Sequence, residues 1–338
     1  MRIETRLPGR LDEAGPEAAR LEALGYDAGL TLETQYDPFL PIVQAAASTS
    51  TFGLGTGIAV AFPRSPMVTA QIAWELQRFS GGRLRLGLGP QVKGHNERRF
   101  SVPWTPPAPR MREYVMALKA IWAGWQSGEA YNFQGEHYQF SLMTPQFAPG
   151  PIHQPDIPVD IAAVGPAMCR VAGEVCDGIR LHPVNSPKYI EDVVLPNVEI
   201  GAKRGGRTIS DVHLIHAGFA VIGDSDAEIQ AARGAVARQI AFYGSTRSYR
   251  GVLEIHGYGD LSPQLHAMSV EGRWGEMTEL ISDEVLQTFA TVGSVEDAAR
   301  ELHRRFGATC GTAEFNAPAQ LADADRASRA IAIARGDG

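Results

Sequence analysis

Two hydrophobic periods alternate along this chain, and each change of period predicts a change of secondary structure. Short and nearly continuous apolar runs are typical of strands buried on both faces, whereas apolar residues spaced three or four apart are typical of amphipathic helices. The clearest example covers residues 52–90. An apolar run at 52–60, a helical pattern at 67–79 and a second apolar run at 84–88 predict one βαβ unit.

The same alternation extends over the rest of the chain. Besides the two strands just described, we expect six more at 2–7, 26–32, 159–163, 178–181, 214–222 and 312–315. Further helices are expected at 12–24, 39–48, 110–123, 167–176, 187–204, 226–242 and 294–305. Eight strands alternating with helices are the number that closes a TIM (β/α)8 barrel. The pattern predicts this α/β fold, as a single domain over residues 1–338.

Two segments depart from the repeat and are predicted to be insertions in βα loops. Residues 101–158 are rich in proline, with a hairpin expected at 131–140, and residues 243–286 are rich in Tyr, His, Gly and Trp. Insertions over the open end of a barrel commonly form lids and pockets. Their candidates for contact with a substrate or a cofactor tail are Tyr243, Tyr249, Arg250 and His256.

Glycines occupy every second position of the run 52–60. Gly53, Gly55 and Gly57 leave one strand face without side chains, and Gly87 and Gly89 do the same in the next strand. Such a face suits a backbone bulge or the approach of a flat ligand. The alternative is that glycine only fits a crowded barrel interior.

Composition narrows the partners. The net charge of -7 includes no basic stripe, which argues against nucleic acid and against anionic membrane surfaces. The 3 cysteines lack metal-binding spacing and are expected to be core thiols in a reducing compartment. The amino terminus resembles a strand rather than a signal, and no apolar run has the length of a membrane span. We therefore expect a cytoplasmic protein that acts on a small molecule.

Barrel enzymes build their sites at the carboxyl ends of the strands, so the strand predictions also select candidate residues. No catalytic triad, P-loop or metal-ligand spacing occurs among these positions, and no metal is expected. Chemistry without an obvious protein nucleophile indicates a cofactor that brings its own reactivity. The candidates after the second, third, fourth and sixth strands are Glu33, Thr34, Gly57, Ile58, Ala59, Gln91, Lys93 and His182.

The turn after the fifth strand is a candidate phosphate site. Its residues are Ala163, Val164, Gly165 and Pro166, directly before a predicted helix. Small residues followed by Gly-Pro leave backbone N–H groups exposed at a helix amino terminus, where phosphate binds readily. Any βα turn can carry Gly-Pro, so an ordinary turn is the alternative.

Several motifs occur together in a familiar order. They are LGTGIAV, RSPMVTAQ, FSGGRLRLGLG, NERRF, MREYVMALKAIW and IAAVGPAMCRVAGEVCDG. In this combination the chain resembles the bacterial luciferase-like superfamily, most closely the branch that uses the deazaflavin coenzyme F420. The resemblance implies a TIM barrel with the cofactor at the carboxyl ends of the strands and hydride transfer as the core chemistry.

The resemblance also implies positions for the cofactor. A non-prolyl cis peptide in the third strand supports the ring in that family, and the matching bond here is Gly57–Ile58. The cofactor phosphate would lie at the turn 163–166, and the reactive face of the ring would be turned toward Glu33, Gln91 and His182. Thr34 and Ala59 complete the expected cofactor contacts.

This sequence departs from the family at the expected acid and base. Many members carry Asp-His at the end of the second strand, where this chain has Glu33-Thr34, and some carry Glu after the fourth strand, where it has Gln91-Val92-Lys93. Glu33, Lys93 or His182 would have to supply any proton transfer.

We thus expect an F420-dependent oxidoreductase acting on an unknown small organic substrate. A monooxygenase using reduced FMN and a non-catalytic flavin-binding paralogue are the alternatives. A homodimer is expected through the helices at 39–48 and 67–79, which carry more apolar surface than one barrel contact needs; the alternative is that this surface packs inward. The residues concerned are Phe39, Ile42, Val43, Met67, Ile72 and Trp74.

Overall fold

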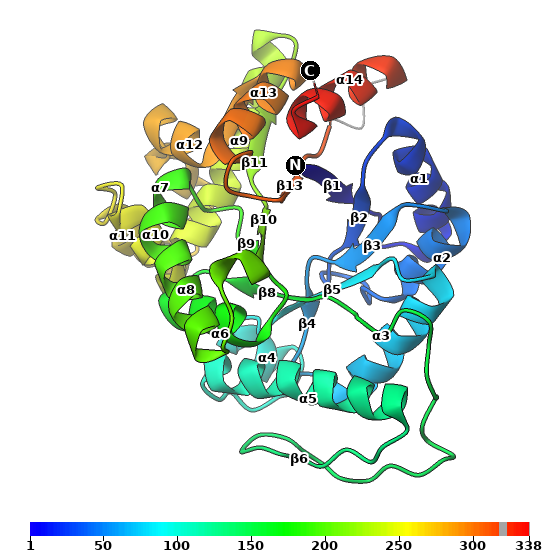
Figure 1. Ribbon diagram of the computed structural model, residues 1–338. Coiled ribbons are helices and arrows are strands. Elements are labelled where there is room, and N and C mark those ends of the chain that lie inside the picture. The colour runs from blue at the N-terminus through cyan, green and yellow to red at the C-terminus, as the bar shows by residue number, and fades with distance from the viewer. Residues whose placement is uncertain (318–322, 338) are drawn as a thin grey trace.

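The computed structural model describes residues 1–317 and 323–337 and shows a closed barrel of parallel strands surrounded by helices (Figure 1). The predicted TIM barrel is confirmed, because the hydrogen-bonded strand order runs once around and closes through β3 and β5. Its strands are β1 (Arg2–Arg6), β2 (Ala28–Thr31), β3 (Gly53–Thr56) continued by β4 (Ala59–Val60), β5 (Leu84–Gly89), β8 (Val159–Ala163), β9 (Gly178–Leu181), β10 (His213–His216) and β13 (Thr312–Glu314).

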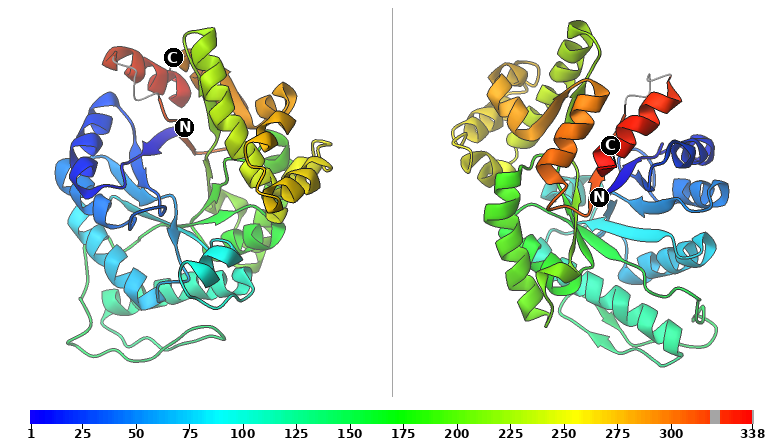
Figure 2. Two further views of the ribbon diagram at one scale, coloured as in Figure 1. Left: turned by 180° about the vertical axis from the view of Figure 1, so that it is seen from behind. Right: turned by 45° about the horizontal axis from the view of Figure 1, so that its top comes forward.

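Helices cover the outside of the barrel and begin and end where local signals place them. Gly25 and Gly81 end two of them in the left-handed conformation, with φ of 94° and 67°. The last helix lies beside the first, so the ring of helices closes next to the amino terminus (Figure 2). The helices of this layer are α1 (Leu11–Leu24), α2 (Leu40–Ser48), α3 (Pro66–Ser80), α5 (Pro107–Ser127), α6 (Pro166–Val175), α7 (Pro187–Tyr189) continuing through η1 (Ile190–Val194) into α8 (Leu195–Arg204), α13 (Val295–Phe306) and α14 (Ala324–Arg335).

The predicted strand at 214–222 is wrong, because the chain leaves the barrel within it. β10 ends at His216, and β11 (Phe219–Ile222) pairs instead with β12 (Ala290–Gly293) in a separate parallel sheet. The late insertion is therefore longer than the predicted 243–286. The helices between its two strands are α9 (Asp226–Gly244), η3 (Arg247–Tyr249), α10 (Arg250–Glu254), α11 (Leu261–Val270), η4 (Glu276–Leu280) and α12 (Asp283–Phe289). Two short helices lie outside this insertion, α4 (Lys93–Arg98) and η2 (Ile209–Asp211).

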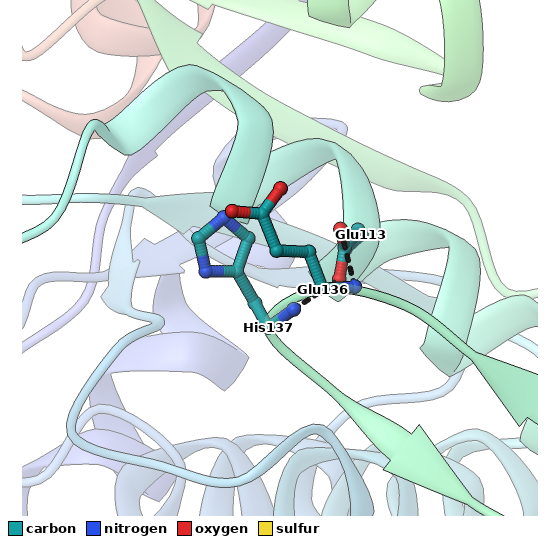
Figure 3. A group of neighbouring side chains, drawn as sticks. All are labelled: Glu113, Glu136 and His137. Carbon is teal, nitrogen blue, oxygen red and sulfur yellow. Dashed lines mark hydrogen bonds between the residues drawn. The ribbon is translucent and has the colours of Figure 1, made fainter.

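The hairpin predicted at 131–140 is confirmed, with β6 (Phe133–Gln134) antiparallel to β7 (Gln139–Phe140). The Glu113 carboxylate of α5 holds its turn by accepting the backbone N–H groups of Glu136, at 3.0 Å, and His137, at 2.7 Å (Figure 3). Ligand atoms of these three side chains lie within 4.8 Å of one another. Because Glu113 is already bound to the turn, we assign the group a structural role.

The barrel interior is charged, and its glycines make room for an arginine. The Arg180 guanidinium of β9 lies 2.8 Å from the Glu4 carboxylate and 3.3 Å from Asp160, and Asp160 also binds Arg85. A Cβ atom at Gly87 would lie 2.7 Å from Nε of Arg180. Gly87, in β5, therefore has no side chain because the barrel interior is crowded there. This is the alternative explanation of the glycine pattern given above.

Other predictions have simpler outcomes. All three cysteines are free and buried, and burial raises the pKa values of Cys169 and Cys310 to about 12, as expected of core thiols. Phe39, Ile42 and Trp74 are buried too, with at most 4% of each residue exposed, so for them the inward alternative is correct. In the described ranges, no helix is both long and apolar enough to cross a membrane.

Candidate active site

The carboxyl ends of the barrel strands bring most of the predicted positions to one end of the molecule. Glu33 follows β2, the Gly57–Ile58 bond separates β3 from β4, and Gln91 follows β5. The turn 163–166 links β8 to α6, and His182 follows β9. This end of the barrel is the candidate site.

The Gly57–Ile58 peptide bond is cis, as predicted. It interrupts the third barrel strand, leaving both residues partly exposed between the buried segments β3 and β4. A Cβ atom at Gly89 would lie 2.6 Å from Cδ1 of Ile58, so the glycine at the end of β5 accommodates the isoleucine side chain. The interruption is a partly exposed bulge held between neighbouring strands.

Glu33 binds this bulge on both sides. Its backbone N–H donates to the carbonyl of Ile58 at 3.3 Å, and its carboxylate accepts the N–H of Val60 at 2.7 Å. Arg64 donates to the same carboxylate oxygen at 2.7 Å, and the Glu33 side chain is only 5% exposed. The carboxylate is therefore engaged in holding the strand around the bulge.

Gln91 and Thr34 lie in the loops that follow β5 and β2, the two strands that neighbour the interrupted third strand. Gln91 has a φ of 59°, which is uncommon for a residue with a side chain and is typical of functional loops. Its Oε1 accepts the N–H of Val92 at 3.0 Å. Thr34 is exposed, and its carbonyl accepts from the Arg99 guanidinium.

Lys93 lies exposed on a short helix, without an ion pair to the other candidates among the described residues. It is the first residue of α4, its side chain is 64% exposed, and its amino group lies 3.8 Å from Glu97 on the same helix. Among the described residues, no hydrogen bond joins it to Glu33 or His182.

The turn 163–166 has the exposed backbone expected of a phosphate site. Gly165 is the N-cap of α6, and a Cβ atom built there would meet nothing within 4 Å. Within residues 1–317 and 323–337, no acceptor binds the N–H groups of Gly165 and Ala167. The partial positive charge of a helix amino terminus also favours the binding of a phosphate. The Val164 carbonyl accepts the Tyr189 hydroxyl at 3.0 Å, which fixes the turn.

His182 lies between two tyrosines of the late insertion. Its ring centroid is 4.3 Å from that of Tyr243 and 4.4 Å from that of Tyr249. Nδ1 accepts the N–H of Val184 at 3.1 Å, so the neutral ring carries its proton on Nε2. Burial lowers the pKa of His182 to about 3. The ring is neutral near pH 7 and can donate one hydrogen bond.

This lowered pKa predicts a pH effect on stability. A histidine whose pKa is lower in the folded state contributes stability that is complete above its unfolded value, about 6.5, and that is lost as the pH falls. Between pH 8 and pH 5, the free energy of unfolding of the parent should fall by about 2 kcal/mol through His182 alone. In His182→Phe this part of the decrease should be absent, as urea titrations at the two pH values will show; an equal decrease in both proteins would contradict it.

The other insertion candidates divide between the site and the surface. His256 is bonded through Nε2 to the hydroxyl of Ser186 at 2.7 Å, which ties α10 to the loop after β9. Arg250 pairs with Glu254 at 2.7 Å on the outside of α10 and is 57% exposed. The insertion therefore contributes Tyr243 and Tyr249 to the candidate site and His256 to its support.

Sequence analysis missed a polar group at the same end of the barrel. Arg6, the last residue of β1, pairs with Glu314, the last residue of β13, and Asn316 donates to the same carboxylate at 2.6 Å. The available signal was the strand RIETR, whose alternation places Glu4 and Arg6 on one face.

Two larger hollows lie at the opposite end of the barrel. One of about 550 Å³ is lined by Asp177, His213 and Gly311, at the amino ends of β9, β10 and β13. Another of about 510 Å³ borders Arg85 and Pro158, at the amino ends of β5 and β8. In TIM barrels, residues at this end serve stability, so we do not place the site there.

Comparisons with known proteins identify the relatives of this chain. The profile of a family described as luciferase-like monooxygenase matches residues 2–310. An uncharacterised protein of Mycobacterium tuberculosis is 48% identical over 305 residues, 90% of each chain. The 5,10-methylenetetrahydromethanopterin reductase of Archaeoglobus fulgidus is 30% identical over 76% of this chain and 74% of its own.

A solved structure has the same fold over nearly the whole chain. The coenzyme F420 dependent tetrahydromethanopterin reductase from Methanopyrus kandleri superposes with a TM-score of 0.77, covering 98% of this chain and 96% of its own. At 22% sequence identity this likeness concerns the fold.

Proposed function

The chain belongs to the luciferase-like monooxygenase family, and we propose that it is an F420-dependent oxidoreductase that transfers hydride between the deazaflavin and a small organic substrate. The observation that supports a flat cofactor with a phosphate in its tail is the partly exposed Gly57–Ile58 bulge, with an open helix amino terminus at Gly165 on the same end of the barrel. The names of the relatives from Archaeoglobus fulgidus and Methanopyrus kandleri support F420 as the cofactor.

The residues at this end of the barrel fit such a cofactor. The N–H groups of Gly165 and Ala167 would bind the phosphate of its tail, and the open space beside Gly165 would admit it. Ile58 would support the ring, with Thr34 and Gln91 at its edge, whereas Ala59 is fully buried and offers no surface for direct contact with it. Bound deazaflavin supplies a two-electron hydride carrier; every other role belongs to the protein.

We assign the three predicted catalytic residues different roles. Glu33 is a positioning residue, because its carboxylate holds Val60 and Arg64 around the bulge. His182 is the better candidate for substrate contact, since its neutral ring offers the Nε2 proton between two tyrosines. Lys93, on the exposed side of α4, has no part in this proposal.

The second candidate is a monooxygenase that uses reduced FMN. It is favoured by the description of the matching family, luciferase-like monooxygenase. The same bulge and the same phosphate turn would hold FMN, because both cofactors have a flat tricyclic ring and a phosphate in the tail.

Cofactor titration separates the two candidates. We expect purified protein to bind F420 at least about tenfold more tightly than FMN, a difference of about 1.4 kcal/mol, measured by cofactor fluorescence. Tighter binding of FMN, together with oxygen consumption on adding reduced FMN, would replace the proposal by the monooxygenase. If the protein binds F420 tightly but no carbonyl or alcohol tested oxidises or reduces the bound cofactor, the protein only binds the cofactor and is not an enzyme that uses it.

We also propose a homodimer through α2 and α3, on a surface formed by Val43 of the predicted residues together with Leu40 and Val68. Leu40 and Val43 lie one turn apart on α2 and are 58% and 41% exposed, and Val68 near the start of α3 is 45% exposed. Apolar side chains exposed on adjacent helices are typical of a subunit interface.

The dimer is tested by placing a charge in this surface. We expect Val43→Glu to be a monomer by light scattering at micromolar concentration, because an unpaired carboxylate at a dimer interface costs several kcal/mol. The matched control is Val270→Glu, on α11, where the valine is 75% exposed. A parent that is already monomeric, or a Val43→Glu protein that remains dimeric, would contradict the proposal.

A further inference from the structure

A small cavity lies at the carboxyl ends of three neighbouring strands, β10, β13 and β1. Its volume is about 150 Å³, room for about five water molecules or for one small functional group with its neighbouring carbons. The barrel forms one wall of the cavity, and the β11–β12 sheet with α9 and α13 forms the other. Figure 1 shows these elements beside β10 and β13. The residues lining it are Arg6, His216, Gly218, Phe219, Ala220, Val236, Gln239, Thr291, Leu302, Glu314, Phe315 and Asn316.

The barrel wall of the cavity offers both a donor and an acceptor. Nε of Arg6 donates to Oε1 of Glu314, at 2.5 Å, and Asn316 donates to the same oxygen at 2.6 Å. In the described part of the chain, no partner binds the two Nη groups of Arg6 or Oε2 of Glu314. The Arg6 side chain is 43% exposed, so it joins the cavity to the open end of the barrel.

His216 adds a buried polar group with nothing to bind. The residue is only 3% exposed and its ring stacks on Phe306, with the centroids 3.6 Å apart. Its Nδ1 is buried without a hydrogen-bond partner among the described residues. Burial, together with the nearby charge of Arg305, lowers the pKa of His216 to about 3, so the ring is neutral at pH 7. The His216 ring lines the cavity, so a ligand bound there would lie against it.

The charges around the cavity indicate which kind of ligand it can bind. Arg6 and Glu314 cancel each other, and His216, Gln239 and Thr291 are uncharged. An oxyanion would meet the Glu314 carboxylate, whereas an uncharged group can accept from Arg6 and donate to Glu314 or His216.

We propose that this cavity receives an uncharged polar group of the substrate, a carboxamide or a hydroxyl with its carbonyl counterpart. The inference rests on the proposed function, because it makes the cavity part of the substrate site. Strands β10 and β13 lie across the barrel from β3 and β4 in the strand order, so a substrate held here would extend over the barrel mouth toward the Gly57–Ile58 bulge. Burial raises the pKa of Tyr243, on α9, and the charge of Arg6 opposes that rise.

The test uses acetamide as the probe and the ring of His216 as the reporter. In protein labelled with ¹³C-histidine and free of cofactor, acetamide should shift the His216 ring signal, identified by its loss in His216→Gln, with a millimolar Kd. The other eight of the 9 histidines serve as internal references. Arg6→Met and Thr291→Val should each raise the Kd about fivefold, the effect of one lost hydrogen bond.

The control for Arg6→Met is Arg2→Met, at the amino end of the same strand, which should leave the Kd unchanged. Acetate and inorganic phosphate are titrated in parallel. Binding of either anion in preference to acetamide would overturn the assignment of an uncharged group. No shift at about 200 mM acetamide, far above the concentration at which a good four-atom ligand binds, would overturn the site itself. The acetamide test is made without F420. A negative result therefore contradicts the cavity proposal alone, whereas a negative F420 titration contradicts the proposed function.

Discussion

Replacing Gly165 with valine is expected to weaken F420 binding by about tenfold to a hundredfold and to leave the melting temperature unchanged. The new side chain would project from the N-cap of α6 into space where no protein atom lies within 4 Å, so the fold has nothing to accommodate. It would displace a phosphate from the N–H groups of Gly165 and Ala167. Hydrogen bonds to a charged group contribute about 1.5–3 kcal/mol each, which gives the expected range.

The matched control is Gly275→Val. A Cβ atom at Gly275 also meets nothing within 4 Å, and this glycine precedes η4 in the late insertion. F420 fluorescence measures the affinity of both variants, and thermal unfolding checks their folds. If Gly165→Val binds F420 as tightly as the parent does, the phosphate lies elsewhere and the assignment of the turn 163–166 is wrong.

Replacing Asp160 with asparagine is expected to lower the free energy of unfolding by about 3 kcal/mol, because it leaves two arginines facing an uncharged group. Asp160 is fully buried and accepts from Arg85 at 2.6 Å, with Arg180 at 3.3 Å. Asparagine has nearly the same shape, so the loss reports charge rather than packing.

The control for the charge is Asp192→Asn, which breaks the exposed pair with Lys188. Surface pairs contribute about 0–1 kcal/mol, so this variant should unfold nearly as the parent does. Both are compared by urea unfolding at pH 7. A loss at Asp160 no larger than that at Asp192 would show that the interior charges do not contribute as the geometry indicates.

The roles proposed for the site follow from which groups are already engaged. Glu33 is held by Val60 and Arg64, so its carboxylate is already engaged, and Lys93 lies exposed on α4 beside Glu97. Among the described residues, His182 and the cavity beside Arg6 present unoccupied polar groups. We therefore propose that substrate recognition occurs on the side of the barrel that carries the late insertion.

Local signals in the sequence were enough to predict the barrel and to select the end of it where the candidate residues lie. Strand and helix periods, the glycine stops at Gly25 and Gly81, and the motif around Gly57–Ile58 all act over a few residues, so they can be read without knowing the fold. The hairpin at 131–140 was predictable for the same reason. These features explain why the fold was predicted correctly and why most of the candidate positions lie at one end of the barrel.

Partners distant in the sequence were decided only by the tertiary structure. The period of residues 214–222 could not show that β11 would leave the barrel, because its partner β12 lies some seventy residues further along the chain. The glycines at 55 and 87 likewise gave no sign of the Arg180 side chain beside them. Arg6 and Glu314 are 308 positions apart and meet only because β1 and β13 close the barrel. Which polar groups are engaged and which remain available depends on such contacts, since a side chain finds its hydrogen-bond partner in space and the sequence pattern records only its own strand or helix.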